Sequence, residues 1–196
     1  MIRIASFRFG RRPFAAALCV CAIMAIIGVR SSAVASADRP VLSGDLASFS
    51  WASSAQPAPT TGFTDEKGNV RTLKEFRGRV VLVNFWATWC APCVREMPSL
   101  ERLQAKLGGP DFTVIALSED RSGWQKIGPF RDKMGLKALP LFHDVSSGAM
   151  FAVRASSLPT TIIYDRDGKE VGRMARPAEW DSSDALALIR YFIARK

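Results

Sequence analysis

Two cysteines, Cys90 and Cys93, stand three positions apart at the end of a long apolar run. A cysteine pair at this spacing can cycle between a dithiol and a disulfide, so these residues point to redox chemistry. The residues after the pair have helical periodicity, which would place Cys90 at the start of a helix. Free backbone N–H groups and the helix dipole stabilise a thiolate there. We therefore expect the pKa of Cys90 to lie below its ordinary value of about 8.5, and Cys93 to be more buried.

Two structural roles for the pair have weaker support. A structural zinc site needs four ligands, and the chain offers only Cys19, Cys21 and His143 besides the pair, with the first two in an N-terminal apolar segment. A purely structural disulfide across so short a loop would restrict the unfolded chain little. We expect no metal and no cofactor apart from a redox-active Cys90–Cys93 disulfide.

Hydrophobic patterning predicts the elements that position the pair. Val80–Trp86 is β-branched and aromatic with almost no polar break, as in a strand buried on both faces. Over residues 92–107, apolar side chains recur every three or four positions, which predicts a helix with one buried face. The further expected elements are a hairpin turning at residues 67–69, a strand at 112–117, helices at 124–134 and 146–153, a hairpin at 160–171 and a final helix from Ala178. This order indicates an α/β domain.

The residues around the pair also carry a family resemblance. Residues 76–98, with the motif Trp-Cys-x-Pro-Cys-x-x-Glu-x-Pro, resemble the thioredoxin-like thiol:disulfide oxidoreductases of the TlpA/ResA group, and most of all its TlpA members. Residues 158–161 resemble the loop that carries that group's cis-proline, residues 164–169 its terminal hairpin and residues 177–190 its closing helix. The resemblance implies a thioredoxin-like α/β fold, with a central mixed sheet flanked by helices, an N-terminal β-hairpin and a helical insertion.

Three residues receive chemical roles. Cys90, at the helix start, is the expected attacking nucleophile, and Cys93, one turn further in, is expected to resolve the mixed disulfide. The resemblance implies that Glu96 exchanges a proton with the thiols. An ordinary solvated side chain is the alternative for Glu96, because glutamate is common in helices and mostly exposed. The resemblance places Asn84 where cytosolic thioredoxins have a buried aspartate. Because this difference removes one proton acceptor, Glu96 or water becomes the more favoured acceptor.

A second group of residues is expected to hold the substrate. The resemblance implies that Pro159 follows a cis peptide bond in a loop that faces the dithiol, where backbone groups can pair with an extended client chain. Trp89, Pro92 and Leu158 would complete this surface. His143, the only histidine, is expected to be an ordinary surface residue.

Composition agrees with one globular domain behind a leader. The 196 residues are 48% hydrophobic, enough for one core. The net charge of +9 falls to +4 without residues 1–37, and neither this balance nor any glycine-rich phosphate loop points to nucleic acid. Residues 38–59, rich in Ser, Ala and Pro, predict a linker, in which the spacing of Leu42, Leu46 and Phe49 would allow a short helix on the domain. We place the thioredoxin-like domain at residues 60–196 and expect a monomer.

Residues 1–37 predict a targeting segment. Arginines precede an apolar run at residues 14–29, and Ala35-Ser-Ala37 resembles a cleavage site. An uncleaved membrane anchor and a signal peptide cleaved after Ala37 are both compatible with this pattern. The arginines ahead of the run would keep the N-terminus inside the cell and place the domain on the periplasmic side of the inner membrane.

Together these observations predict a periplasm-facing reductase of protein disulfides, supplied with electrons by a membrane dithiol donor and associated with the membrane through its N-terminal segment. The clients that the resemblance implies are copper-site assembly proteins of cytochrome oxidase or apocytochrome c. A disulfide oxidant or isomerase stays open as an alternative. So does a thioredoxin-like copper chaperone, although that class has three residues between its cysteines. A thiol peroxidase is excluded because its Pro-x-x-x-Thr-x-x-Cys pattern would need threonine at Ala87.

Overall fold

The computed structural model describes residues 39–195, so the predicted targeting segment lies outside the described residues. Its strands are β1 Ser50–Trp51, β2 Phe63–Thr64, β3 Val70–Arg71, β4 Val80–Trp86, β5 Phe112–Ser118, β6 Leu141–His143, β7 Thr160–Tyr164 and β8 Glu170–Met174. Its α-helices are α1 Ala91–Leu107, α2 Trp124–Met134, α3 Gly148–Ala152 and α4 Ser183–Ala194. Short 3-10 helices lie at η2 Gly44–Ser48, η3 Leu73–Phe76 and η4 Val145–Ser147.

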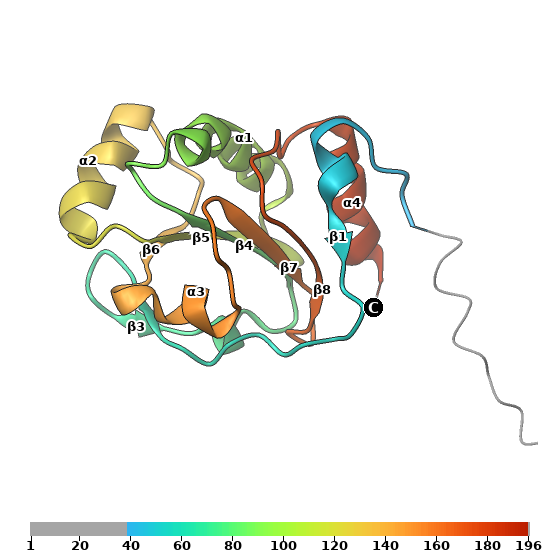
Figure 1. Cartoon of the computed structure of the whole chain (residues 1–196), viewed down its shortest axis with the longest axis horizontal. Helices are drawn as coiled ribbons and strands as arrows, with labels where there is room; N and C mark the ends of the chain where they lie inside the picture. The colour runs from blue at the N-terminus through green and yellow to red at the C-terminus, as the bar shows by residue number, and fades with distance from the viewer. Residues whose placement is uncertain (1–38, 196) are drawn as a thin grey trace, which may run out of the picture. The chain divides into compact units, whose positions relative to one another are not determined.

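The strands of residues 39–195 form one mixed sheet in the order β1-β8-β7-β4-β5-β6-β2-β3 (Figure 1). Strands β4, β5 and β6 run parallel, and β7 and β8 continue the sheet in antiparallel fashion beyond β4. The β2–β3 hairpin pairs with β6 at the other edge. This is the mixed α/β, thioredoxin-like architecture that the sequence predicts.

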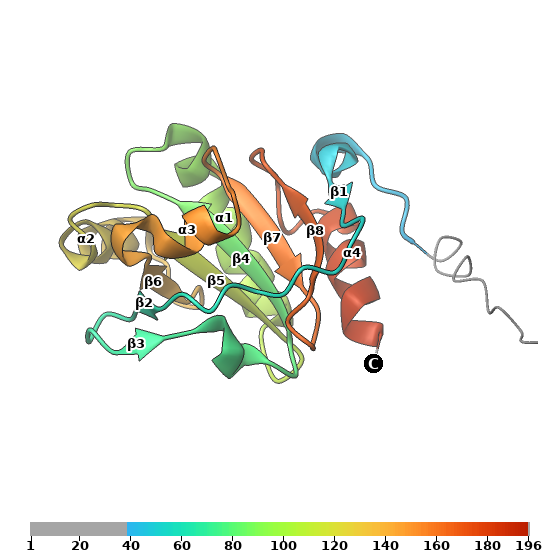
Figure 2. The same cartoon turned by 60° about the horizontal axis from the view of Figure 1, so that its bottom comes forward.

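Helices cover both faces of the sheet, so its central strands are buried on each side. Along β4, Leu82 and Trp86 join the core that contains α1 and α4, whereas Val81, Val83 and Phe85 join the core beneath α3. Figure 2 shows α3 on the face away from α1 and α4. Alternate residues of a strand point to opposite faces, which explains why β4 needs an uninterrupted apolar run.

Most elements lie where the pattern predicts them, and three do not: α4, β6 and the short strand β1. The final helix begins at Ser183 rather than at Ala178, because Ser182 caps it by accepting a hydrogen bond from the Ala185 backbone N–H. Residues 178–181 form a loop whose backbone N–H groups donate to side chains of α1. Strand β6 was not predicted, since its three residues are too short to show a period.

The segment expected to be a linker is packed on the domain. The short helix predicted near Leu42–Phe49 is present as η2, and β1 adds to the free edge of β8. Leu46 and Phe49 are buried in the main core. A side chain at position 172 of β8 would collide with the Phe49 ring, so Gly172 allows this close approach. Across the described part of the chain, no helix has the length and apolar character needed to cross a membrane.

Candidate active site

Cys90 and Cys93 form a disulfide at the junction of β4 and α1, with Cα atoms 5.3 Å apart. Cys90 is the N-cap residue of α1, and its Sγ accepts a hydrogen bond of 3.3 Å from the Cys93 backbone N–H. Pro92 lies in the first turn, where a missing N–H costs nothing. When the disulfide is reduced, this N–H group and the positive end of the helix dipole stabilise negative charge on the Cys90 sulfur.

The two sulfur-bearing residues differ in their access to solvent. Cys90 is 6% exposed and lines a cleft of about 570 Å³, whereas Cys93 is fully buried and does not line it. Trp89, Pro92 and Leu158 line the same cleft. Trp89 is 70% exposed, so its indole stands out from the surface beside the disulfide. The cleft therefore offers Cys90, and not Cys93, to an incoming molecule.

The Leu158–Pro159 peptide bond is cis, as the resemblance implies. Leu158 lines the cleft, while Pro159 is buried directly before β7. Three of the four residues predicted to hold the substrate thus line the cleft with Cys90.

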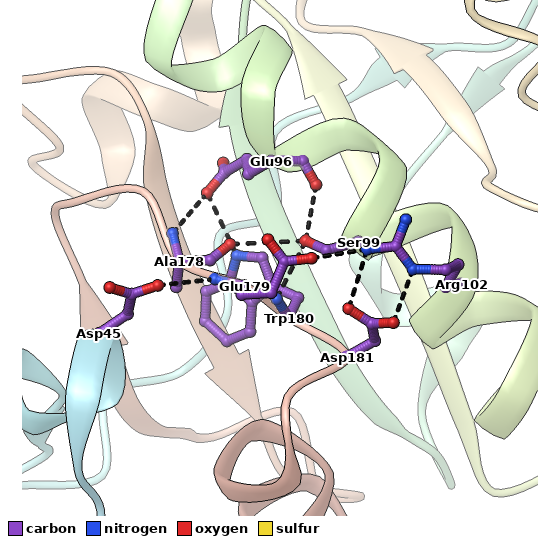
Figure 3. A network of polar contacts seen from close by, with 8 residues as sticks. All are labelled: Asp45, Glu96, Ser99, Arg102, Ala178, Glu179, Trp180 and Asp181. Carbon is purple, nitrogen blue, oxygen red and sulfur yellow. Dashed lines mark hydrogen bonds and ion pairs between the residues drawn. The ribbon is translucent and has the colours of Figure 1, made fainter.

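Glu96 is buried, 2% exposed, one helical turn beyond Cys93. Its Oε1 accepts a 2.7 Å hydrogen bond from Asn84 Nδ2. Its Oε2 accepts from the Ala178 backbone N–H at 3.1 Å and from Trp180 Nε1 at 3.2 Å (Figure 3). Burial raises the pKa of Glu96 to about 7, although all three donors favour the charged form. A carboxyl with this pKa can both take and give a proton near neutral pH.

Asn84 connects this carboxyl to the strand after the cis-proline. Its Nδ2 also donates to Thr161 Oγ1 on β7 at 2.9 Å. Asn84 thus brings an amide on β4 against a carboxyl on α1 and donates to it. The solvated-surface alternative for Glu96 is wrong, because tertiary packing encloses the side chain.

A second carboxyl at the cleft, Glu119, was not among the predicted residues. It follows β5 directly and lines the cleft. Burial, with the neighbouring Asp144 and Asp120 carboxylates, raises the pKa of Glu119 to about 8. The available signal was its position, since functional side chains gather at the carboxyl ends of parallel strands.

His143 ends β6 and does not line the cleft beside the cysteines. Within residues 39–195, no group of three or more His, Cys, Asp and Glu side chains is arranged to hold a metal ion.

The chain is similar to known proteins in sequence and in fold. Over 114 residues, the chain is 34% identical to thiol-disulfide oxidoreductase ResA of Geobacillus kaustophilus (strain HTA426), a match that covers 57% of this chain and 63% of that protein. It is 35% identical to ResA of Bacillus thuringiensis (strain Al Hakam) over 114 residues, or 58% of this chain and 65% of that protein. The chain therefore matches less than two thirds of the length of either relative.

The fold also has solved counterparts. The thioredoxin domain of a thiol-disulfide oxidoreductase from Bacteroides vulgatus superposes with a TM-score of 0.60 at 22% identity, covering 72% of this chain and 99% of that one. A thioredoxin-family thiol:disulfide interchange protein from Chlorobium tepidum TLS gives 0.56 at 22% identity, covering 73% and 99%. Residues 55–170 match the model of the AhpC/TSA family. The chain belongs to the AhpC/TSA family and has its thioredoxin-like fold.

Proposed function

We propose that this protein is a thiol:disulfide oxidoreductase that reduces disulfides in client proteins. The observation that carries the proposal is the placement of the cysteines: Cys90 lines a cleft at the start of α1, and Cys93 is enclosed one turn before a buried carboxyl. One sulfur is accessible for attack and the other is protected. The curated relatives carry the same activity in their names.

The first half of the reaction joins enzyme and client. The Cys90 thiolate attacks one sulfur of the client disulfide, which forms a Cys90–client bond and breaks the client bond. The other client sulfur leaves as a thiolate and takes up a proton. Trp89, Pro92 and Leu158 hold the client chain in the cleft, with the Pro159 loop beside them.

The second half releases the client. The Cys93 thiol gives its proton to the Glu96 carboxylate, and the Cys93 thiolate attacks Cys90 Sγ. The bond between Cys90 and the client breaks, and the second client sulfur leaves as a thiolate that also takes up a proton. The client has then gained two electrons and two protons, and the enzyme holds the Cys90–Cys93 disulfide seen here. A membrane dithiol donor reduces this disulfide by the same exchange.

We place this reaction on the periplasmic side of the inner membrane, because residues 1–37 have the pattern of an export signal or anchor. The proposed clients are copper-site assembly proteins of cytochrome oxidase or apocytochrome c. Both carry closely spaced cysteines that must be reduced before they bind copper or haem.

Trapping the mixed disulfide tests the proposal. In Cys93→Ser the second half cannot proceed, so the exported protein should accumulate a Cys90–client disulfide that is visible on non-reducing gels and removed by dithiothreitol. The captured client should contain a closely spaced cysteine pair. Cys90→Ser is the matched control and should capture little. More efficient capture by Cys90→Ser than by Cys93→Ser would show that the roles are inverted.

A further inference from the structure

The loop between β8 and α4 supplies two of the three hydrogen bonds to the Glu96 carboxylate. Both reach Oε2, one from the Ala178 backbone N–H and the other from Trp180 Nε1. Trp180 is fully buried, and Ala178 is nearly so. Residues 178–181, which we name the carboxyl loop, therefore determine how many donors the Glu96 carboxylate has. None of the chemistry described above uses the loop itself.

Arg102 anchors the carboxyl loop to α1. Its Nε donates to Asp181 Oδ2 at 2.6 Å, and its Nη2 donates to Glu179 Oε1 at 2.6 Å and to Asp181 Oδ1 at 3.1 Å (Figure 3). This fork holds the loop on both sides of Trp180. A planar guanidinium can make both contacts at once, whereas a lysine ammonium cannot reproduce the geometry.

Three further hydrogen bonds hold the same loop. Ser99 Oγ accepts one of 3.0 Å from the Trp180 backbone N–H and donates one of 3.5 Å to the Ala178 carbonyl. Asp45 Oδ2 accepts one of 3.2 Å from the Glu179 backbone N–H. Ser99 lies on α1, between Glu96 and Arg102, and Asp45 lies in η2. The helix that follows Cys90 and carries Glu96 thus also carries two of the three anchoring residues, Ser99 and Arg102.

The carboxyl loop also walls a groove of about 280 Å³ that reaches Glu96. The charged side chains that line the groove beside Glu96 are Asp45, Arg95 and Glu179. On α1 and its N-cap, the other titratable groups near Glu96 are the cysteines, which precede it in the sequence. Within residues 39–195, the residues lining the dithiol cleft do not include Glu96. Glu96 therefore meets solvent on a side separate from the one that receives the client.

We propose that Arg102 is a positioning residue for Glu96: it holds the carboxyl loop so that the Ala178 and Trp180 N–H groups set the proton affinity of this carboxyl. The inference rests on the proposed function, in which Glu96 takes the proton of Cys93. Arg102 does not line the cleft that contains Cys90, so it acts through the loop.

Titration of the Glu96 carboxyl by carbon-13 NMR in the oxidised protein tests the inference without any client. Arg102→Met should release the loop and weaken both N–H donors, so the pKa of Glu96 should rise by about one pH unit from its value of about 7. Arg102→Lys keeps the charge but loses the fork, and it should give an upward shift in the same direction. The indole N–H resonance of Trp180 should move in both variants.

Arg131 provides a matched control, because it also pairs with two carboxylates, those of Glu66 and Asp132. Arg131→Met should leave the Glu96 titration unchanged. An unchanged or lowered Glu96 pKa in Arg102→Met would overturn the inference. So would a shift in Arg102→Met that Arg102→Lys abolishes, because it would show that charge alone is responsible.

The rate of disulfide exchange separates this inference from the proposed function. If Glu96 transfers the proton, the pH–rate inflection should move with the Glu96 pKa in Arg102→Met, and Arg102→Met should have no such effect in a Glu96→Gln background. A shifted carboxyl pKa with an unmoved inflection would support Arg102 as a positioning residue and refute the proton-transfer role of Glu96.

Discussion

Replacing Glu96 with glutamine should make the folded protein more stable in mild alkali. The substitution removes the buried ionisable group and keeps its shape. Glutamine can still accept from Ala178 and Trp180 through its oxygen, while its amide group faces Asn84. The Asn84 Oδ1 atom has no hydrogen-bond partner within residues 39–195, so a flip of the Asn84 amide would present this oxygen to both glutamine and the Thr161 hydroxyl.

The magnitude follows from the pKa of Glu96, which lies at about 7 in the folded protein and at an ordinary value of 4.5 in the unfolded chain. Between these values the folded protein keeps a proton that the unfolded chain has lost. The free energy of unfolding therefore falls as pH rises from 4.5 to 7 and stays low above it. Each pKa unit is worth about 1.4 kcal/mol, so the carboxyl costs the folded protein about 3 kcal/mol above pH 7.

Urea unfolding of the oxidised proteins at a series of pH values measures this effect. We expect Glu96→Gln and its parent to have similar free energies of unfolding near pH 4.5, and the variant to be about 3 kcal/mol more stable at pH 8. The exposed Glu66→Gln variant serves as the control and should follow the parent. A difference between Glu96→Gln and parent that is the same at pH 5 and pH 8 would refute the assignment of a raised pKa to Glu96.

The remaining predictions concern redox poise, client binding and packing. Equilibration with glutathione or dithiothreitol buffers should give a midpoint potential nearer thioredoxin, about −270 mV, than DsbA, about −120 mV, and a value above about −180 mV would favour the oxidant or isomerase alternative. Trp89→Ala should raise the KM for a protein disulfide without changing the rate with a small aromatic disulfide, since the indole is exposed beside the cleft. Leu46→Ala should lower the free energy of unfolding by about 2 to 5 kcal/mol and expose residues 43–51 to proteolysis, because this side chain is buried.

Sequence patterns predicted the placement of the dithiol because the signals that create it are local. A buried strand, a short turn and an amphipathic helix occupy consecutive residues, so their junction can be located without knowing the rest of the fold. The two parallel strands β4 and β5 follow for the same reason, since a helix connects them directly. The resemblance added the cis bond before Pro159, which the structure shows.

The carboxyl loop could not be predicted in the same way. Residues 177–182 contain good helix formers, and the capping signal at Ser182 competes with an earlier start. Residues 178–180 are held by partners distant in sequence: the Ala178 and Trp180 N–H groups donate to Glu96 and Ser99 across about 80 positions. No local pattern reports such tertiary hydrogen bonds, so patterning alone cannot place this loop.

The sequence alone gives one indication that Glu96 is buried. It stands three residues after Cys93 and four before Leu100, both of them core residues of α1, so the helical period already places it on the apolar face. A buried carboxylate needs donors, and Asn84 supplies one where an aspartate would have brought a second negative charge to 2.7 Å. Two such carboxyls could not both ionise, and one pKa would rise further. Asn84 on β4 and Glu96 on α1 look unrelated in the sequence. The hydrogen bond between them makes both part of one site that can hold a proton.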